Sequence, residues 1–288
     1  MSPRIAWVDG ELVPRDEARV SIDDFGFRYG LACFETMLAK NGKVFRLSEH
    51  LDRLEGSLAL FRAAAPARTM LRRAITATLK ANALDDASVR LSVTPGLGTR
   101  PALPATGTPT VVITVDEVGP PPAPARLWVS SVRLDASRPW RGAKMAHFAP
   151  YLLARAEAME RGLDDGLLLD QRGHMAEAAT SNAFFSINGV LITPPLSDGP
   201  LPGVTRAAVL EAAAGLKIAT REATVTLHDL QRVDAAFLTS SIAGLTPVRS
   251  IGWEDGGQRH LWQPSGDTSL VATLQEAYER LVVAGTAT

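Results

Sequence analysis

The sequence predicts two mixed α+β domains joined by a short linker. Three observations support this fold class. The chain has 288 residues, which suits two domains of about 100 to 200 residues each. Segments with the two-residue period of strands alternate with segments of helical period in both halves. A proline cluster separates the halves and cannot continue a helix or a central strand. We therefore expect an N-terminal domain over 1–118, a linker over 119–125 and a C-terminal domain over 126–288.

Two hairpins are predicted at the start of the first half. Apolar residues alternate on both sides of Asp9-Gly10, and strand-like runs flank Asn41-Gly42. Both dipeptides accept the positive φ angles of a two-residue turn. Four apolar residues after the second hairpin fall on one helical face, and Ser48 precedes them as the expected N-cap. The remaining predicted elements of this half are a helix over 69–83 and strands over 88–93 and 110–115.

The second half is predicted to open with a strand over 127–134. A long helix then runs from Met145 to about Gly162, because this segment is rich in strong helix formers. Strands dominate afterwards, apart from a helix that starts near Thr205 and a closing helix over 268–283. The predicted strands lie at 166–170, 184–187, 190–193, 218–225, 235–239 and 247–251.

Composition excludes several classes of protein. The formal net charge is -1, which gives no reason to expect nucleic acid or an anionic membrane surface as a partner. No apolar stretch approaches the roughly 20 residues of a membrane span, and acidic residues stand where a signal peptide would be apolar. The single Cys33 and the scattered histidines predict no disulfide and no metal site. We therefore expect a cytoplasmic protein.

Few lysine side chains are available in this chain for a reaction that needs an amine. Only five of the 30 basic residues are lysines, at positions 40, 43, 80, 144 and 217. Generic motifs do not narrow the choice, because no Walker loop, HExxH pair or GxSxG elbow is present. The glycines at 96 and 98 superficially resemble a dinucleotide loop, but Pro101 stands in the region of its third glycine and Pro104 blocks the helix that such a loop requires. Composition and generic motifs therefore leave the function open.

Seven segments occur in the order that one enzyme family shows. The sequence resembles the class IV aminotransferases, pyridoxal-phosphate enzymes that include branched-chain and D-amino acid aminotransferases and aminodeoxychorismate lyase. The resemblance covers nearly the whole chain and implies fold type IV, with the active site between two domains of a homodimer. It rests on DFGFRYG at 24–30, CFET at 33–36, EHLDRL at 49–54, Lys144, Glu177 with Ser181 and Asn182, LPGVTR at 201–206, and TSS at 239–241 before TPV at 246–248.

The resemblance implies a role for Lys144 and for two residues that follow it. Lys144 is similar to the Schiff-base lysine that binds pyridoxal 5'-phosphate. Glu177 lies in an apolar setting, where a carboxylate needs a partner, and the resemblance supplies one in the protonated pyridine nitrogen of the cofactor. Asn182 belongs to the same motif and is implied as a further cofactor-binding residue.

The cofactor's phosphate needs an anion site, and the resemblance implies which residues form it. A helix N-terminus offers backbone N–H groups to an anion, and arginine adds a forked, permanently charged donor. Without the resemblance, the serines would be turn residues and the arginine a helix-surface charge. The implied phosphate-binding residues are Arg53, Gly203, Val204, Thr205, Ser240 and Ser241.

Two arginines are candidates for binding a substrate carboxylate. Arg100 resembles the carboxylate-binding arginine of D-amino acid aminotransferases, although Ala102 replaces the histidine that accompanies it there. Arg90 resembles a position that branched-chain enzymes use, and a structural ion pair is an equal alternative. Tyr29 and Phe34 are expected to line the pocket wall.

The resemblance implies an aminotransferase that works in two half-reactions between an amino acid and a 2-oxo acid. The donor is of D-amino acid or branched-chain type, or an R-amine, and the freed Lys144 amine acts as general acid/base. One departure is Ala149, which stands where branched-chain enzymes carry a tyrosine, and it puts strict branched-chain specificity in doubt. The alternative function is an aminodeoxychorismate lyase that releases pyruvate and 4-aminobenzoate. A non-catalytic binding protein with a degenerate enzyme fold is the third hypothesis.

Overall fold

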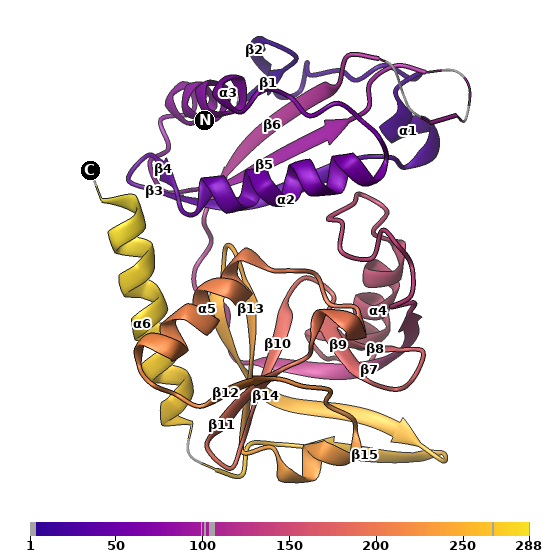
Figure 1. Ribbon diagram of the computed structural model, residues 1–288, viewed down its shortest axis with the longest axis vertical. Helices are drawn as coiled ribbons and strands as arrows, with labels where there is room; N and C mark the ends of the chain where they lie inside the picture. Colours follow the sequence, from indigo (N-terminus) through magenta and orange to yellow (C-terminus); the bar gives the residue numbers. More distant parts are fainter. Residues whose placement is uncertain (1–3, 99, 101, 104–106, 267, 288) are drawn as a thin grey trace. The chain divides into compact units, whose positions relative to one another are not determined.

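The computed structural model describes residues 4–98, 100, 102–103, 107–266 and 268–287 (Figure 1). The chain forms two compact units. Unit 1 comprises Met1–Gly119, Ala143–His147 and Val282–Thr288, and unit 2 comprises Pro120–Gly142 and Phe148–Leu281. The chain first passes to unit 2 at the proline cluster. Two short segments of the second half belong with unit 1, however, which the predicted division at residues 118 and 126 does not include.

Unit 1 contains an antiparallel six-stranded sheet in the order β2-β1-β6-β5-β3-β4. Both predicted hairpins are present. Asp9-Gly10 and Asn41-Gly42 adopt the positive φ angles that their turns require, at 48°, 115°, 52° and 71°. The strands are β1 Ile5–Val8, β2 Glu11–Pro14, β3 Cys33–Lys40, β4 Lys43–Val44, β5 Ala87–Thr94 and β6 Thr110–Glu117.

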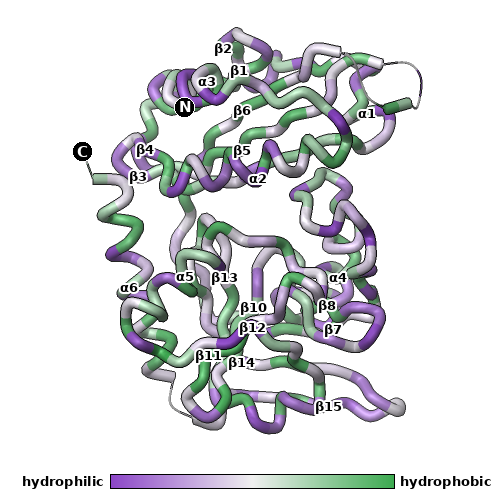
Figure 2. The backbone as a smooth tube through the Cα atoms, viewed as in Figure 1, coloured by the Kyte–Doolittle hydropathy of each residue, from purple (hydrophilic) through white to green (hydrophobic). Residues whose placement is uncertain are grey.

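Helices α2 (Leu47–Leu60) and α3 (Arg68–Ala81) cover one face of this sheet. Figure 2 shows polar and apolar residues mixed along α2, and its buried face includes Leu51, Leu54 and Leu58. The predicted N-cap at Ser48 is wrong. Arg46, with φ 51°, turns the chain directly from the hairpin into the helix, so Ser48 lies inside it. The short helix α1 (Phe25–Tyr29), capped by the Asp24 side chain, was not predicted.

The segment that carries Lys144 extends the unit 1 sheet. Phe34 N donates to the Lys144 carbonyl at 3.0 Å, and Ala146 N donates to the Ala32 carbonyl at 2.8 Å. The Lys144 N–H also donates to Ser57 Oγ at 3.2 Å. Because these backbone groups pair with β3, helix α4 begins at Ala149 and not at the predicted Met145.

Unit 2 contains a nine-stranded sheet in the order β12-β11-β10-β13-β14-β7-β8-β9, and β15 pairs with β14. An additional pairing between β9 and β10 closes six of these strands into a ring, whose apolar cluster includes Leu167, Phe185 and Ile251. The strands are β7 Ala125–Leu134, β8 Asp165–Asp170, β9 Met175–Ala178, β10 Asn182–Ile187, β11 Val190–Thr193, β12 Thr220–Glu222, β13 Ala235–Ser240, β14 Gly244–Asp255 and β15 Gln258–Trp262.

Three α-helices belong wholly or mainly to unit 2. Besides α4 (Ala149–Glu160), they are α5 (Val204–Gly215) and the closing helix α6 (Ser269–Thr286). Short 3-10 helices lie at Leu196–Asp198 and His228–Arg232. Strands β9 and β15 were not predicted, and the strand expected over 218–225 is reduced to β12. Of the helices that the structure describes, none has the length and apolarity needed to cross a bilayer.

Candidate active site

Strand pairing in unit 2 places three polar residues in one row. The register sets Asn182 of β10 opposite Glu177 of β9 on one side and opposite Thr239 of β13 on the other. Directly opposed residues of neighbouring strands present their side chains on the same face. All three residues are buried. Positions 57 residues apart in the sequence, 182 and 239, are therefore neighbours on one face of the sheet.

Both carboxylate oxygens of Glu177 accept hydrogen bonds. Oε1 accepts from Arg141 Nη2 at 2.8 Å and from the Tyr151 hydroxyl at 3.0 Å. Oε2 accepts from the Leu201 N–H at 2.9 Å, and Asn182 Nδ2 lies 3.4 Å away. The predicted pair of Glu177 and Asn182 is thus brought together. Arg141 and Tyr151 were not predicted, although they lie three residues before and seven residues after Lys144 in the sequence.

The N-terminus of α5 has the features of an anion site. Gly203 is its N-cap, and Val204 and Thr205 form its buried first turn. No side-chain cap bonds to the first N–H groups of this helix among the described residues, so these donors remain for an anion. Gly203 also packs closely on its surroundings, because a Cβ atom there would lie 2.0 Å from Asn182 Oδ1.

This close approach predicts a large effect of Gly203→Ala. The added methyl group must displace the buried Asn182 amide, so we expect a loss of about 1 to 3 kcal/mol in unfolding free energy and weaker pyridoxal-phosphate binding. Gly215→Ala at the other end of α5 is the matched control, since nothing lies within 4 Å of a Cβ there. Thermal unfolding and cofactor titration of both variants test this expectation. Equal behaviour of the two variants would contradict it.

The turn after β13 carries the predicted serines. Ser240 Oγ accepts from the Ala243 N–H at 3.3 Å, and Ser241 lies half-buried in the same turn. The preceding Thr239 is 2% exposed, and its hydroxyl has no hydrogen-bond partner among the described residues. A buried polar atom without a partner is unfavourable unless a ligand satisfies it. Thr239 was missed as a candidate, although it directly precedes the two serines.

In unit 1, Lys144 and the predicted substrate-binding residue Arg90 both contact the aromatic ring of Phe34. The Lys144 amine lies 4.7 Å from the centre of the Phe34 ring, and the Arg90 guanidinium lies 4.0 Å from it. Burial lowers the pKa of Arg90. The structure thus brings Lys144, Phe34 and Arg90 together on the face of the sheet opposite helices α2 and α3.

Arg53 is anchored by a buried carboxylate. Its Nε and Nη2 atoms donate to the two oxygens of Glu35 at 2.8 and 2.5 Å, and His50 Nδ1 lies 2.7 Å from Glu35 Oε2. Glu35 is fully buried and Arg53 is 9% exposed. Burial opposes the charge of Glu35, but the hydrogen bonds from Arg53 and His50 outweigh it and lower its pKa. Glu35 therefore fixes the orientation of the predicted phosphate-binding arginine.

The lowered pKa of Glu35 makes stability depend on pH. Its contribution is complete above the ordinary value of 4.5 and is lost as pH falls through the lower folded-state value. Glu35→Gln is therefore expected to lower the unfolding free energy by about 3 to 5 kcal/mol at pH 7. The difference from the unmodified protein should shrink below pH 4.5. Urea unfolding across pH tests this, with Glu117→Gln in the exposed Arg4 pair as control.

The two remaining predicted residues lie on the surface of unit 1. Tyr29 is 41% exposed and packs its ring against Phe25, with centroids 5.3 Å apart. Arg100 is exposed, and its carbonyl accepts from the Ala102 N–H at 2.8 Å. Residues 99 and 101 lie outside the described residues. The expected roles of Tyr29 and Arg100 in the pocket stay predictions.

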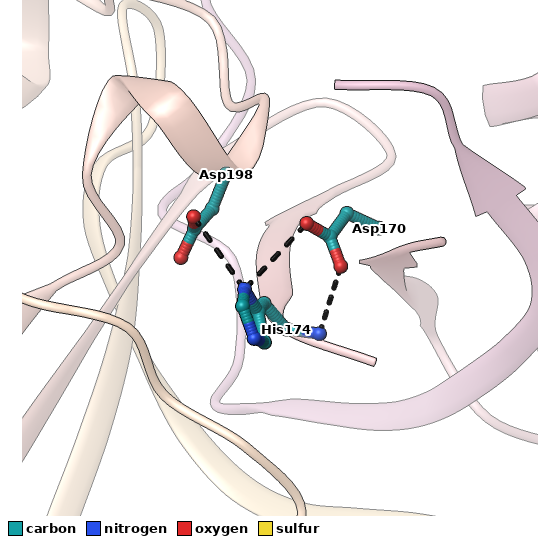
Figure 3. Close-up of side chains that lie close together, drawn as sticks. All are labelled: Asp170, His174 and Asp198. Carbon is teal, nitrogen blue, oxygen red and sulfur yellow. Dashed lines mark hydrogen bonds and ion pairs between the residues drawn. The ribbon is translucent and has the colours of Figure 1, made fainter. Parts of the chain in front are cut away.

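Asp170, His174 and Asp198 form a cluster of metal-ligating types (Figure 3), with their ligand atoms within 4.8 Å of one another. No metal was predicted from the sequence. Arg172 Nη2 lies 2.6 Å from Asp170 Oδ2 and 2.8 Å from Asp198 Oδ1. A cation of the protein therefore already bridges both carboxylates. Thr224 also donates to Asp198 at 2.7 Å, so the cluster anchors the loop that leads to Leu201 and Gly203.

Each unit by itself carries polar groups of the types that bind pyridoxal phosphate. Unit 1 supplies an amine in Lys144 and a forked cation in Arg53. Unit 2 supplies the buried carboxylate of Glu177, the uncapped N-terminus of α5 and the unpartnered Thr239 hydroxyl. An amine, a carboxylate and donors to an anion are the types of group that this cofactor requires.

Comparisons with known proteins show the family of this chain. A model of the amino-transferase class IV family matches residues 32–251. A Methanocaldococcus jannaschii protein, provisionally named a branched-chain-amino-acid aminotransferase, is 34% identical over 250 residues, which are 85% of this chain and 87% of that one.

Solved structures show the same similarity. The branched-chain aminotransferase of Escherichia coli superimposes with a TM-score of 0.87 and 28% identity, over 99% of this chain and 96% of that one. A second branched-chain enzyme, from T.th. and complexed with N-(5'-phosphopyridoxyl)-L-glutamate, gives 0.85 and 29%, over 99% and 95%. A Legionella pneumophila protein, provisionally described as a 4-amino-4-deoxychorismate lyase, gives 0.84 over 93% and 97%. Its 22% identity shows the fold alone.

Proposed function

Because the chain belongs to the class IV aminotransferase family and is a pyridoxal-phosphate-dependent aminotransferase, we propose that it transfers the amino group of a branched-chain amino acid to a 2-oxo acid. One observation carries this choice of donor: the Arg90 guanidinium and the Lys144 amine contact the same Phe34 ring. A cation that can bind a carboxylate and an apolar surface that suits an aliphatic side chain thus lie beside the candidate reactive amine.

The cofactor-binding roles follow from the chemistry of each side chain. When bound, pyridoxal phosphate supplies an electrophilic carbon and an electron-withdrawing ring. The Lys144 amine holds the cofactor and later moves a proton at its Nζ atom. Glu177 would accept a hydrogen bond from the protonated pyridine nitrogen and so keep that nitrogen charged. The residues proposed to bind the phosphate offer donors to anions, and they are Arg53, Gly203, Val204, Thr205, Ser240 and Ser241.

A D-amino acid donor is the second candidate for the same site. The exposed Arg100 supports it, because a surface loop arginine can bind a carboxylate. The replacement of the accompanying histidine by Ala102 favours the branched-chain donor, and so do the names of the proteins that this chain resembles. The lyase function requires elimination of pyruvate instead of amine exchange. The half-reaction screen described next distinguishes it from both transaminase functions.

A half-reaction screen tests the donor. Purified protein loaded with pyridoxal phosphate is mixed separately with L-leucine, D-alanine and a simple R-amine, and absorbance follows conversion of the cofactor to its pyridoxamine form. We expect L-leucine to convert it fastest. Faster conversion by D-alanine or the R-amine would replace the proposed donor. No conversion by any donor, together with pyruvate release from aminodeoxychorismate, would establish the lyase.

We also propose that the protein is a cytoplasmic homodimer. The large apolar side chains Ile22 and Phe27 are 74% and 73% exposed in the single chain, which is typical of a surface that a second copy covers. The single Cys33 is buried and free, which suits a reducing compartment. Light scattering of the purified protein tests the dimer, and a monomer mass at micromolar concentration would refute it.

A further inference from the structure

Three hydrogen bonds connect Arg141, Tyr151 and the Oε1 atom of Glu177 in a closed hydrogen-bonded ring. Arg141 Nη2 donates to Glu177 Oε1 at 2.8 Å, and Arg141 Nη1 lies 2.9 Å from the Tyr151 hydroxyl. The same hydroxyl donates to Glu177 Oε1 at 3.0 Å. One arginine thus bonds both to the carboxylate and to the phenol that supports it. Neither Arg141 nor Tyr151 belongs to the motifs that identify the family.

This hydrogen-bonded ring is buried, and Arg141 and Tyr151 stay protonated within it. The side chains of Arg141 and Glu177 are 13% and 6% exposed. Burial opposes the charge of Arg141, but the neighbouring Glu177 and Tyr151 raise its pKa. Burial, together with the charge of Glu177, also raises the pKa of Tyr151. Both groups therefore remain hydrogen-bond donors at neutral pH.

The surrounding structure fixes each member of the ring in position. The Tyr151 ring stacks on Phe148 with centroids 4.8 Å apart, in the first turn of α4. Gly199, with φ 96°, allows the neighbouring loop to approach Arg141, because a Cβ there would lie 3.0 Å from Arg141 Nε. The same loop presents the Leu201 N–H to Glu177 Oε2. Movement of Glu177 would therefore break contacts to three separate segments of unit 2.

The two oxygens of Glu177 differ in what they can still accept. Oε1 has two close side-chain donors. Oε2 has one backbone donor at 2.9 Å and the amide of Asn182 at the longer distance of 3.4 Å. A carboxylate offers about four acceptor positions, and the weakest of the four contacts is the one from Asn182. Oε2 is therefore the oxygen with room for a further strong donor.

We propose that Arg141 and Tyr151 are positioning residues that hold the Glu177 carboxylate in place through Oε1 and leave Oε2 to accept a hydrogen bond from the cofactor's protonated pyridine nitrogen. This inference rests on the proposed role of Glu177. The two hydrogen bonds to Oε1, from the Arg141 guanidinium and the Tyr151 phenol, fix the rotation of the carboxylate. Partners that orient a binding side chain typically change affinity or activity 10- to 100-fold when they are removed.

A cofactor analogue separates this role from a merely structural one. We would measure dissociation constants of pyridoxal phosphate and of its 1-deaza analogue, which has no pyridine nitrogen, for the unmodified protein, Arg141→Met, Arg141→Lys and Tyr151→Phe. Arg141→Met is expected to weaken binding of pyridoxal phosphate about 10- to 100-fold and binding of the analogue by no more than about twofold. Tyr151→Phe should weaken only the natural cofactor, by about threefold to tenfold, and Arg141→Lys should recover part of the loss.

Several outcomes would overturn the inference. Equal weakening of both ligands would mean that Arg141 only maintains the structure, and tighter binding in Arg141→Met would mean that it opposes the pyridine proton. If Arg141→Met does not fold, the other two variants replace it in this test. Unchanged binding of pyridoxal phosphate by both Arg141→Lys and Tyr151→Phe would then contradict the inference. Arg126→Met, which removes an exposed pair with Asp164, is the matched control. Failure of the proposed function would give a different result from failure of this inference. In that case the unmodified protein itself would bind both ligands equally or would bind neither.

Discussion

Lys144→Ala is expected to abolish covalent attachment of pyridoxal phosphate and to lower transaminase activity by at least about 10⁴-fold, the usual effect of removing a covalent nucleophile. The fold should survive. The backbone of residue 144 is held by bonds to Phe34 and Ser57, and the cation–π contact with Phe34 contributes only about 0.5 to 1 kcal/mol. The absorbance of the lysine-bound cofactor and the melting temperature measure the two effects separately.

A second lysine provides the control for this experiment. Lys80→Ala changes an exposed residue of α3 and should leave absorbance and activity unchanged. If Lys144→Ala keeps the lysine-bound absorbance band, another of the five lysines holds the cofactor. The assignment of Lys144 would then be wrong even though the family is correct.

Glu177→Gln is expected to reduce activity about 10²- to 10³-fold, the typical effect of removing one electrostatic group from a reaction site. A neutral amide cannot keep the pyridine nitrogen protonated. The substitution also leaves the buried charge of Arg141 without its carboxylate partner, so we expect a loss of about 3 to 5 kcal/mol in unfolding free energy. Steady-state kinetics and urea unfolding measure these two effects.

The double variant Arg141→Met with Glu177→Gln separates the two effects. Removing both charges eliminates the uncompensated cation, so most of the stability should return. Activity should not return, because the carboxylate is still absent. Recovery of activity together with stability would show that Glu177 acts only in folding, and its proposed role would be wrong.

The elements that the sequence predicts best are those with local causes. Asp9-Gly10 and Asn41-Gly42 determine their hairpins through their own φ preferences, and α2 follows from the spacing of its apolar residues. Strand β9, Met175–Ala178, was missed because the residues between the predicted strands at 166–170 and 184–187 were expected to form a polar loop. It is a strand because it pairs with β8 and β10. The start of α4 was misplaced for a similar reason, since pairing with β3 holds residues 144 and 146 outside the helix.

In the candidate site, too, residues recognised from local sequence differ from residues whose role depends on distant contacts. Lys144, Glu177 and Gly203 became candidates from the sequence because each lies in a segment that resembles a family motif. The closeness of Gly203 to Asn182 could not be predicted, because it depends on how a loop returns to a sheet. Arg141 and Tyr151 have no motif, and their importance becomes visible only when strand register brings Glu177 next to them. Buried partners of a recognised residue are thus the part of a site that a single sequence reveals least.

The division of the chain into units has a consequence for protein engineering. The chain passes between the units after residues 119, 142, 147 and 281, so a single cut at the proline cluster does not yield two complete modules. A fragment that ends at residue 119 would lack the lysine-bearing segment and would expose the β3 edge, which invites aggregation. Recombination between relatives should therefore preserve function only when all three segments of unit 1 come from one parent.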